Sequence, residues 1–146
     1  MVTGQTSDRD KTLLIIKPSL YQEHIDRIVI TEVVRKKLYV EDSIFYKIGE
    51  IPQEQILELY KEHQKKYYYD SLLYFMMSGN INIYKIIGED AFSKINNLKG
   101  RTNPKESAPD SIRGRFRQFS FAVFDNFIHA PTSVEEAKRE LDIFFT

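Results

Sequence analysis

The chain has 146 residues, of which 42% are hydrophobic and 29% charged, a length and composition typical of one globular domain. Its 21 basic and 21 acidic residues give a net charge of zero, which excludes an overall electrostatic attraction to nucleic acid or to a membrane surface. It contains no cysteine, which excludes disulfides and thiolate catalysis, and with no apolar run of about 20 residues we expect a cytoplasmic protein.

The first half of the chain predicts two strands and three helices. Residues 1–11 lack an apolar period and predict a frayed leader before a single domain over residues 12–146. The apolar run Leu13–Ile16 predicts a buried strand that ends at Pro18, because proline cannot donate to a strand ladder. The next predicted elements are a helix over His24–Leu38, a strand over Val40–Ile48, a helix from Pro52 to Tyr60 and a helix over Tyr67–Met77.

The second half predicts further strands and helices around a long loop. In chain order these are a strand over Ile81–Ile87, a helix over Asp90–Leu98, a loop over Gly100–Arg117, a strand over Phe119–Ile128, a helix to about Leu141 and an edge strand over residues 143–145. Ser133 is the predicted N-cap of the last helix, with Glu136 completing a capping box. This alternation favours an α/β sandwich with helices over a sheet.

His129 is the first candidate for chemistry, because it follows an apolar strand and precedes a proline turn. An imidazole is a nucleophile that is neutral near pH 7, provided that its other nitrogen has a partner that fixes the tautomer. Glu140, on the next predicted helix, is the candidate partner. The alternatives are a histidine satisfied by a backbone carbonyl and a glutamate in a surface salt bridge.

Two cations from distant segments are candidates for phosphate binding. Lys17 ends a buried strand, where an ammonium needs an anion or water. Arg113 stands beside Gly114 in the long loop, and its planar guanidinium suits bidentate contact with phosphate. The alternatives are a lysine that reaches solvent and a solvated basic loop. The same loop region also holds Lys99, Arg101, Arg115 and Arg117.

Three residues could form a clamp on a nucleotide base, namely Tyr60, Tyr68 and Leu72. Aromatic rings stack on any base, because every base has a π-face. Packing between two amphipathic helices explains each of these residues equally well. His24 and His63 have no ligand partners at a metal-binding spacing, so the sequence predicts no zinc site.

Motifs along the whole chain resemble those of the nucleoside diphosphate kinase family. They are Thr12–Pro18, Tyr60–His63, Phe75–Gly79, Gly100–Pro104, Ala108–Gly114 and Asn126–His129. Each motif alone is weak, but their order along the chain is specific.

The resemblance implies a ferredoxin-like βαββαβ sandwich (α+β), with an antiparallel sheet covered by helices. It implies ping-pong transfer of a γ-phosphoryl group from a nucleoside triphosphate, with Mg²⁺, to a nucleoside diphosphate through a phosphohistidine at His129. It further implies phosphate contacts from Lys17, Thr102 and Arg113, a sugar contact from Asn126, and a base site at Tyr60, Tyr68 and Leu72. Family members are homo-oligomers, mostly hexamers and less often tetramers or dimers. Mg²⁺ would be bound through the nucleotide phosphates, with no metal ligands from protein side chains.

Four departures from the family pattern predict reduced activity. They are Ser19 after Lys17-Pro18 in place of aspartate, Asn96 in place of a phosphate-binding arginine, Ala130-Pro131-Thr132 in place of Gly-Ser-Asp, and about three additional residues within 117–125. Loss of one charge-assisted contact costs about 1.5–3 kcal/mol, which is roughly ten- to hundredfold in affinity. Arg101, Arg115 or Arg117 is expected to compensate for Asn96.

Two alternative functions are weighed against the kinase. The first is a nucleotide-binding or interaction module of the same fold with weak or lost kinase activity, which Asn96, Pro131 and the additional residues within 117–125 favour. The second is nucleic-acid binding through residues 113–117, which the zero net charge disfavours. The kinase is favoured because Lys17, Thr102, Arg113, Asn126, His129 and Glu140 are all present.

Overall fold

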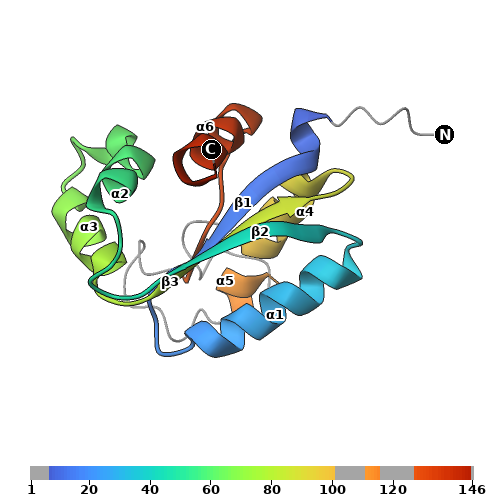
Figure 1. Ribbon diagram of the computed structural model, residues 1–146, viewed down its shortest axis with the longest axis horizontal. Helices are drawn as coiled ribbons and strands as arrows, with labels where there is room; N and C mark the ends of the chain where they lie inside the picture. Colours follow the sequence, from blue (N-terminus) through green and yellow to red (C-terminus); the bar gives the residue numbers. More distant parts are fainter. Residues whose placement is uncertain (1–6, 101–110, 116–126, 146) are drawn as a thin grey trace.

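The structure, a computed structural model, describes residues 7–100, 111–115 and 127–145. Within these ranges an antiparallel sheet has the strand order β2-β3-β1-β4 (Figure 1). Its strands are β1 (Lys11–Ile16), β2 (Tyr39–Tyr46), β3 (Ile81–Ile87) and β4 (Ile128–His129). This strand order with helical crossovers is that of a ferredoxin-like α+β sandwich, which confirms the predicted fold class.

Helices cover both faces of the sheet. One face packs against α1 (Gln22–Arg35), α4 (Ala91–Lys99) and α5 (Ile112–Arg115), and the other against α2 (Gln53–Leu59), α3 (Tyr69–Met77) and α6 (Val134–Phe144). In Figure 1, α1 lies below the sheet and α6 above it. Two short 3-10 turns are η1 (Asp8–Asp10) and η2 (Lys61–His63). Among the described residues, no helix combines the length and the apolar character needed to span a bilayer.

Alternation along β1 divides the core into two clusters. Leu14 and Ile16 pack with α1 and α4, whereas Leu13 and Ile15 pack with α2, α3 and the end of α6. All four side chains are fully buried, and each contributes about 1.5–3 kcal/mol relative to an exposed position. The apolar run in the sequence therefore corresponds to a strand covered on both faces.

Several boundaries differ from the prediction. The expected leader spans residues 1–11, but Asp8–Asp10 form η1 and Lys11 opens β1, while residues 1–6 lie outside the described ranges. Helix α1 ends at Arg35 and not at Leu38, because Lys37 adopts a left-handed conformation with φ of 60° that turns the chain into β2. Residues 119–126 of the predicted fourth strand also lie outside the described ranges.

The predicted edge strand over residues 143–145 is wrong, because α6 continues to Phe144. Phe144 is buried in the cluster of α2 and α3, and the amide of Phe145 donates to the carbonyl of Leu141. Ala137, Leu141 and Phe144 recur at helical spacing and place the apolar residues on one helix face.

The prediction of an irregular loop throughout Gly100–Arg117 is also corrected, because Ile112–Arg115 form α5. The Ser111 hydroxyl accepts from the amide of Gly114 at 3.0 Å, and Ile112 is fully buried below the sheet. The buried apolar residue and the hydroxyl that accepts from Gly114 both stabilise this turn.

Candidate active site

The site lies at the edge of the sheet formed by β4. The chain enters β4 through Phe127, a buried residue with a left-handed φ of 72°. The amide of Lys17 donates to the carbonyl of Phe127 at 2.8 Å, and His129 pairs with Ile15 across the ladder. The sheet therefore brings the end of β1 and the predicted nucleophile together, although they are far apart in the sequence.

A carboxylate fixes the tautomer of His129. Nε2 of His129 lies 2.7 Å from Oε1 of Glu140, whose side chain is buried on α6. A neutral imidazole carries one proton, and the carboxylate accepts it at Nε2, which leaves the lone pair on Nδ1. The ring of Tyr60 contacts the imidazole edge-on, with ring centroids 5.6 Å apart. Nδ1 is therefore the nitrogen able to act as a nucleophile.

Burial keeps this imidazole neutral. The His129 side chain is 17% exposed, and burial lowers its pKa below the ordinary value of 6.5. The positive charges of Lys17 and Lys99 act in the same direction, whereas Glu140 opposes them. The neutral form of the imidazole therefore predominates at neutral pH.

Three buried cations lie near the end of β4, namely Lys17 (4% exposed), Lys99 (6%) and Arg113 (4%). The charges of Lys17 and Lys99 act on the imidazole, and Arg113 bonds to the backbone of the preceding residue. Burial lowers the pKa of Arg113 to about 10. The Nε–H of Arg113 is buried and has no hydrogen-bond partner among the described residues. An unpaired donor and a surplus of buried positive charge are suited to an anion.

The backbone around His129 is held by three side chains. Arg113 Nη2 donates to the carbonyl of Ile128 at 2.7 Å, Lys99 Nζ to that of Ala130 at 3.2 Å, and Asn96 Nδ2 to that of Pro131 at 3.0 Å. These side chains come from α4 and α5. Helices on one face of the sheet thereby fix the strand end that presents the imidazole to the other face.

Lys99 was missed as an individual site residue by the sequence reasoning, which treated it only as part of a basic region. Ile95 and Lys99 are four residues apart on α4, and both belong to its buried face. A lysine in the apolar stripe of an amphipathic helix is the signal that could have found it. By contrast, Arg115, expected to compensate for Asn96, lies 3.9 Å from Glu32 on α1, and Arg101 and Arg117 lie outside the described ranges.

The three predicted base-binding residues are in different environments. Tyr60 and Leu72 are buried in the core cluster formed with α2 and α3. Tyr68 is partly buried, and its hydroxyl lies 2.7 Å from Nδ1 of His63. The predicted phosphate and sugar contacts Thr102 and Asn126 lie outside the described residues.

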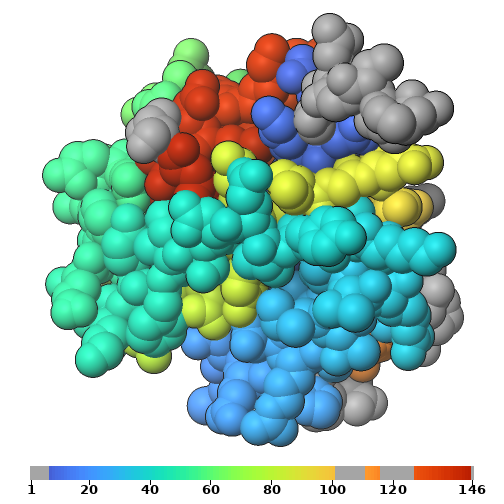
Figure 2. Space-filling model, turned by 45° about the vertical axis from the view of Figure 1, so that its right-hand side comes forward, coloured from blue at the N-terminus to red at the C-terminus, as the bar shows by residue number. Residues whose placement is uncertain are grey.

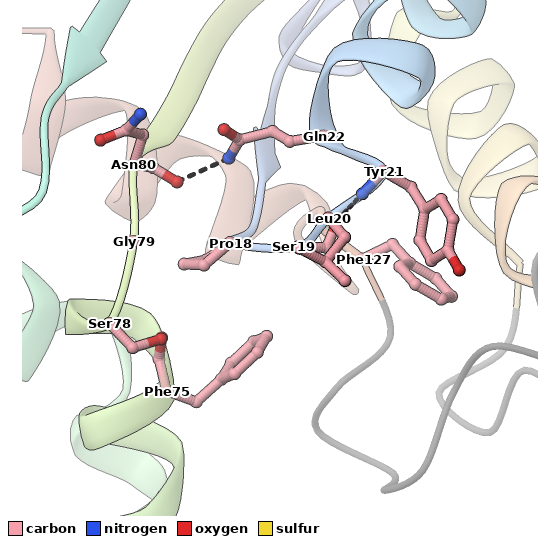
Figure 3. Close-up of a pocket in the computed structure, with 10 residues that line it drawn as sticks. All are labelled: Pro18, Ser19, Leu20, Tyr21, Gln22, Phe75, Ser78, Gly79, Asn80 and Phe127. Atoms are coloured by element: carbon pink, nitrogen blue, oxygen red, sulfur yellow. Dashed lines mark hydrogen bonds between the residues drawn. The ribbon is translucent and has the colours of Figure 1, made fainter.

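A cavity of about 640 Å³ lies elsewhere, between the segment after β1 and the end of α3 (Figure 3). Pro18 and Leu20 line one side, and Phe75 and Asn80 the other. The Gln22 side-chain amide donates to the carbonyl of Asn80 at 2.5 Å. None of the predicted site residues that the structure describes lines this cavity.

A neutral imidazole with its Nδ1 lone pair available, near buried cations on a ferredoxin-like sheet, is an arrangement suited to a phosphotransferase. The family model of nucleoside diphosphate kinase matches residues 10–146. The chain therefore belongs to the nucleoside diphosphate kinase family, and it is an enzyme that transfers a phosphoryl group between nucleotides. The family acts on nucleotides and needs a divalent cation for catalysis.

Relatives and solved structures agree with this family. The nucleoside diphosphate kinase of Methanocaldococcus jannaschii is 31% identical over 137 residues, 94% of each chain. That of Staphylococcus aureus is 35% identical and covers 93% of this chain and 87% of its own. The structure resembles the nucleoside diphosphate kinase of Encephalitozoon cuniculi, with a TM-score of 0.83 and 25% sequence identity, and the match covers 93% of this chain and 88% of that one. The match to the nucleoside diphosphate kinase family protein from Babesia bovis has a TM-score of 0.82 and 28% sequence identity, and it covers 94% of this chain and 88% of that one.

Proposed function

We propose that Nδ1 of His129 carries the phosphoryl group in a ping-pong reaction. Nδ1 attacks the γ-phosphorus of a nucleoside triphosphate, an N–P bond forms, the bond to the bridging β–γ oxygen breaks, and the nucleoside diphosphate leaves. A second diphosphate then takes the group by the reverse steps. The observation that carries the proposal is the bond from Nε2 to Glu140, because it leaves the Nδ1 lone pair available.

The charge changes in this reaction suit the surrounding residues. When Nδ1 bonds to phosphorus and Nε2 keeps its proton, the ring becomes cationic, and the Glu140 carboxylate stabilises it. Lys17 and Arg113 are the proposed ligands of the phosphoryl oxygens, because both are buried cations, Lys17 acting on the imidazole and Arg113 bonding to the carbonyl of Ile128 before it. The unpaired Nε–H of Arg113 supports an anionic ligand at this point.

The remaining nucleotide contacts are proposed from the resemblance. Thr102 is assigned to phosphate and Asn126 to the sugar. The base is assigned to Tyr68 with Tyr60 and Leu72 behind it, since these two pack in the core beneath the same helices. Tyr68, the partly exposed member, is the one suited to stacking.

We propose Mg²⁺ as the divalent cation, brought in on the nucleotide phosphates. Among the described residues, no group of three or more His, Cys, Asp or Glu side chains could hold a metal. Glu140, the acid nearest the imidazole, is engaged by His129. The bound cation would offset the negative charge of the phosphates.

The test is labelling with ATP that is radioactive at the γ-phosphorus, with Mg²⁺ and no acceptor. The protein is expected to retain acid-labile label, and added GDP is expected to remove it as GTP. His129→Ala is expected to abolish labelling, whereas the matched control His24→Ala, at an exposed histidine of α1, is expected to label normally. Full labelling of the His129→Ala protein would overturn the proposal.

We further propose a homo-oligomer, with a hexamer favoured and a tetramer or dimer as alternatives. β2 is an edge strand of the sheet, and it carries Tyr39 at 67% exposure and Phe45 at 52%. Figure 2 displays this strand at the surface, between α1 and α6. An exposed edge with large apolar side chains is suited to pairing with a second copy. The cytoplasmic location expected from the sequence stays a prediction.

A further inference from the structure

We propose that the ammonium of Lys99 is a third cation of the phosphoryl site and stabilises the phosphoryl group while it is on His129. Lys99 is the last residue of α4, and its Nζ bonds to the carbonyl of Ala130, the residue that follows the imidazole. This inference rests on the proposed function and adds a residue to it.

Within the described part of the chain, the surroundings of Lys99 do not neutralise its charge. Its side chain is buried, and within the described residues its Nζ makes one hydrogen bond, at 3.2 Å, to a neutral carbonyl and no ion pair. Glu140 is close enough to influence Lys99, but its carboxylate accepts from His129. An ammonium has three donors, so a buried one with a single carbonyl partner keeps donors for an anion.

The charge count favours an anion beside Lys99. In the free enzyme the described site holds three cations, Lys17, Lys99 and Arg113, against the single carboxylate of Glu140. Phosphoryl transfer leaves the ring cation paired with Glu140 and places a group of about two negative charges among the three cations. The mutual repulsion of the cations therefore falls when His129 is phosphorylated, and Lys99 contributes to that gain.

The same charges make the free energy of His129 phosphorylation depend on pH. Burial, followed by the charge of Arg113, lowers the pKa of Lys99 to about 8, and Glu140 opposes this shift. The imidazole of His129, which Lys99 also influences, stays neutral, and the charge of Lys17 acts on that same imidazole. A phosphoryl group raises the pKa of Lys99 again. Above pH 8, phosphorylation of His129 therefore takes up a proton at Lys99, and the phosphoenzyme becomes less favourable as pH rises.

The experiment compares Lys99→Met and Lys99→Arg with the native protein. Lys94→Met is the matched control, because Lys94 lies on the same helix and its Nζ bonds to the carbonyl of Lys36, also at 3.2 Å. The equilibrium between free and phosphorylated enzyme is measured at fixed ATP and ADP from pH 7 to pH 10, together with thermal melting.

Lys99→Met is expected to lower the equilibrium constant for phosphoenzyme formation by about ten- to hundredfold at pH 7. Lys99→Arg is expected to keep this equilibrium constant within a few fold of the native value. Both variants are expected to lose the decline above pH 8 that the native protein and Lys94→Met retain, because arginine stays charged and methionine carries no charge. A helix contact that only supports the backbone would not alter this pH profile.

Three outcomes overturn the inference: native labelling by Lys99→Met, an equal loss in Lys94→Met, or a native protein whose equilibrium is flat above pH 8. If thermal melting shows that Lys99→Met is not folded, the pH profiles of the native protein and Lys99→Arg test the inference. Absence of label from the native protein would instead overturn the phosphohistidine proposal, so the two failures are distinct.

Discussion

The bond between Nε2 of His129 and Oε1 of Glu140 assigns different tasks to the two ring nitrogens. The Glu140 carboxylate makes this a charge-assisted bond, and in the proposed reaction its negative charge matters most once the ring is cationic. A neutral acceptor at this position would preserve the tautomer but not the stabilisation of the cation. The pair therefore allows orientation and electrostatics to be tested separately.

Glu140→Gln is expected to slow labelling of the protein by ATP by roughly ten- to hundredfold, because a charge-assisted hydrogen bond becomes a neutral one. The glutamine carbonyl can still accept from Nε2–H, so some labelling is expected to remain. The measurement is the single-turnover rate of label uptake. Glu136→Gln is the control on the same helix, since Glu136 pairs with Arg139. An unchanged rate in Glu140→Gln would contradict this role.

At the scale of an element, the helix α6 carries Glu140, and its N-terminus is capped by Ser133. The Ser133 hydroxyl accepts from the amide of Glu136 at 3.1 Å, as predicted, while the Glu136 carboxylate accepts from Arg139. The cap orders the first turn of the helix that presents the carboxylate to His129.

Ser133→Ala is expected to lower the free energy of unfolding by about 0.5–2 kcal/mol, because one backbone amide at the start of α6 loses its acceptor. Denaturant unfolding followed by circular dichroism gives the value. Thr132→Ala, at the exposed preceding position, serves as the comparison and is expected to have a smaller effect. Equal losses from the two variants would argue against a capping role for Ser133.

The elements also indicate what the sequence could and could not predict. The apolar run of β1 and the alternation in β3 each match a single strand, so both were predicted well. The tail at residues 143–145 was misassigned because Ile143, Phe144 and Phe145 are consecutive, and only packing against α2 and α3 selects the helix. α5 was missed because Ile112 is its one buried apolar side chain and has no periodic apolar neighbours in the sequence.

The site was predicted unevenly for a physical reason. His129 and Glu140 are separated by one turn and part of one helix, so local spacing was enough to pair them. Lys99 joins the site through the way α4 packs against β1, a long-range contact that no short motif contains. Tyr60 could equally be a clamp or a core residue by sequence, and its buried ring shows that it packs in the core.

At the scale of the whole molecule, β2, an edge strand of the sheet that the described residues form, leads to a prediction about assembly. Phe45→Glu is expected to reduce the average mass in solution, because a charge placed on an edge strand opposes pairing with a second copy. Light scattering coupled to size exclusion measures this mass. Tyr74→Glu, at an aromatic residue of α3 that is 80% exposed, is the control and is expected to leave the mass unchanged. An unchanged mass for Phe45→Glu would remove β2 from the interface.

The two-residue β4 has a consequence for how this enzyme tolerates changes in length. Ile128 faces the cluster of α1 and α4, and His129 faces Tyr60 and Glu140. The two neighbouring side chains of β4 therefore point to opposite faces of the sheet. One residue inserted between Ile128 and His129 would rotate the imidazole away from its carboxylate and bury it among aliphatic side chains. A change in chain length before Phe127 does not by itself alter this alternation, because the alternation depends on the residues of β4 alone.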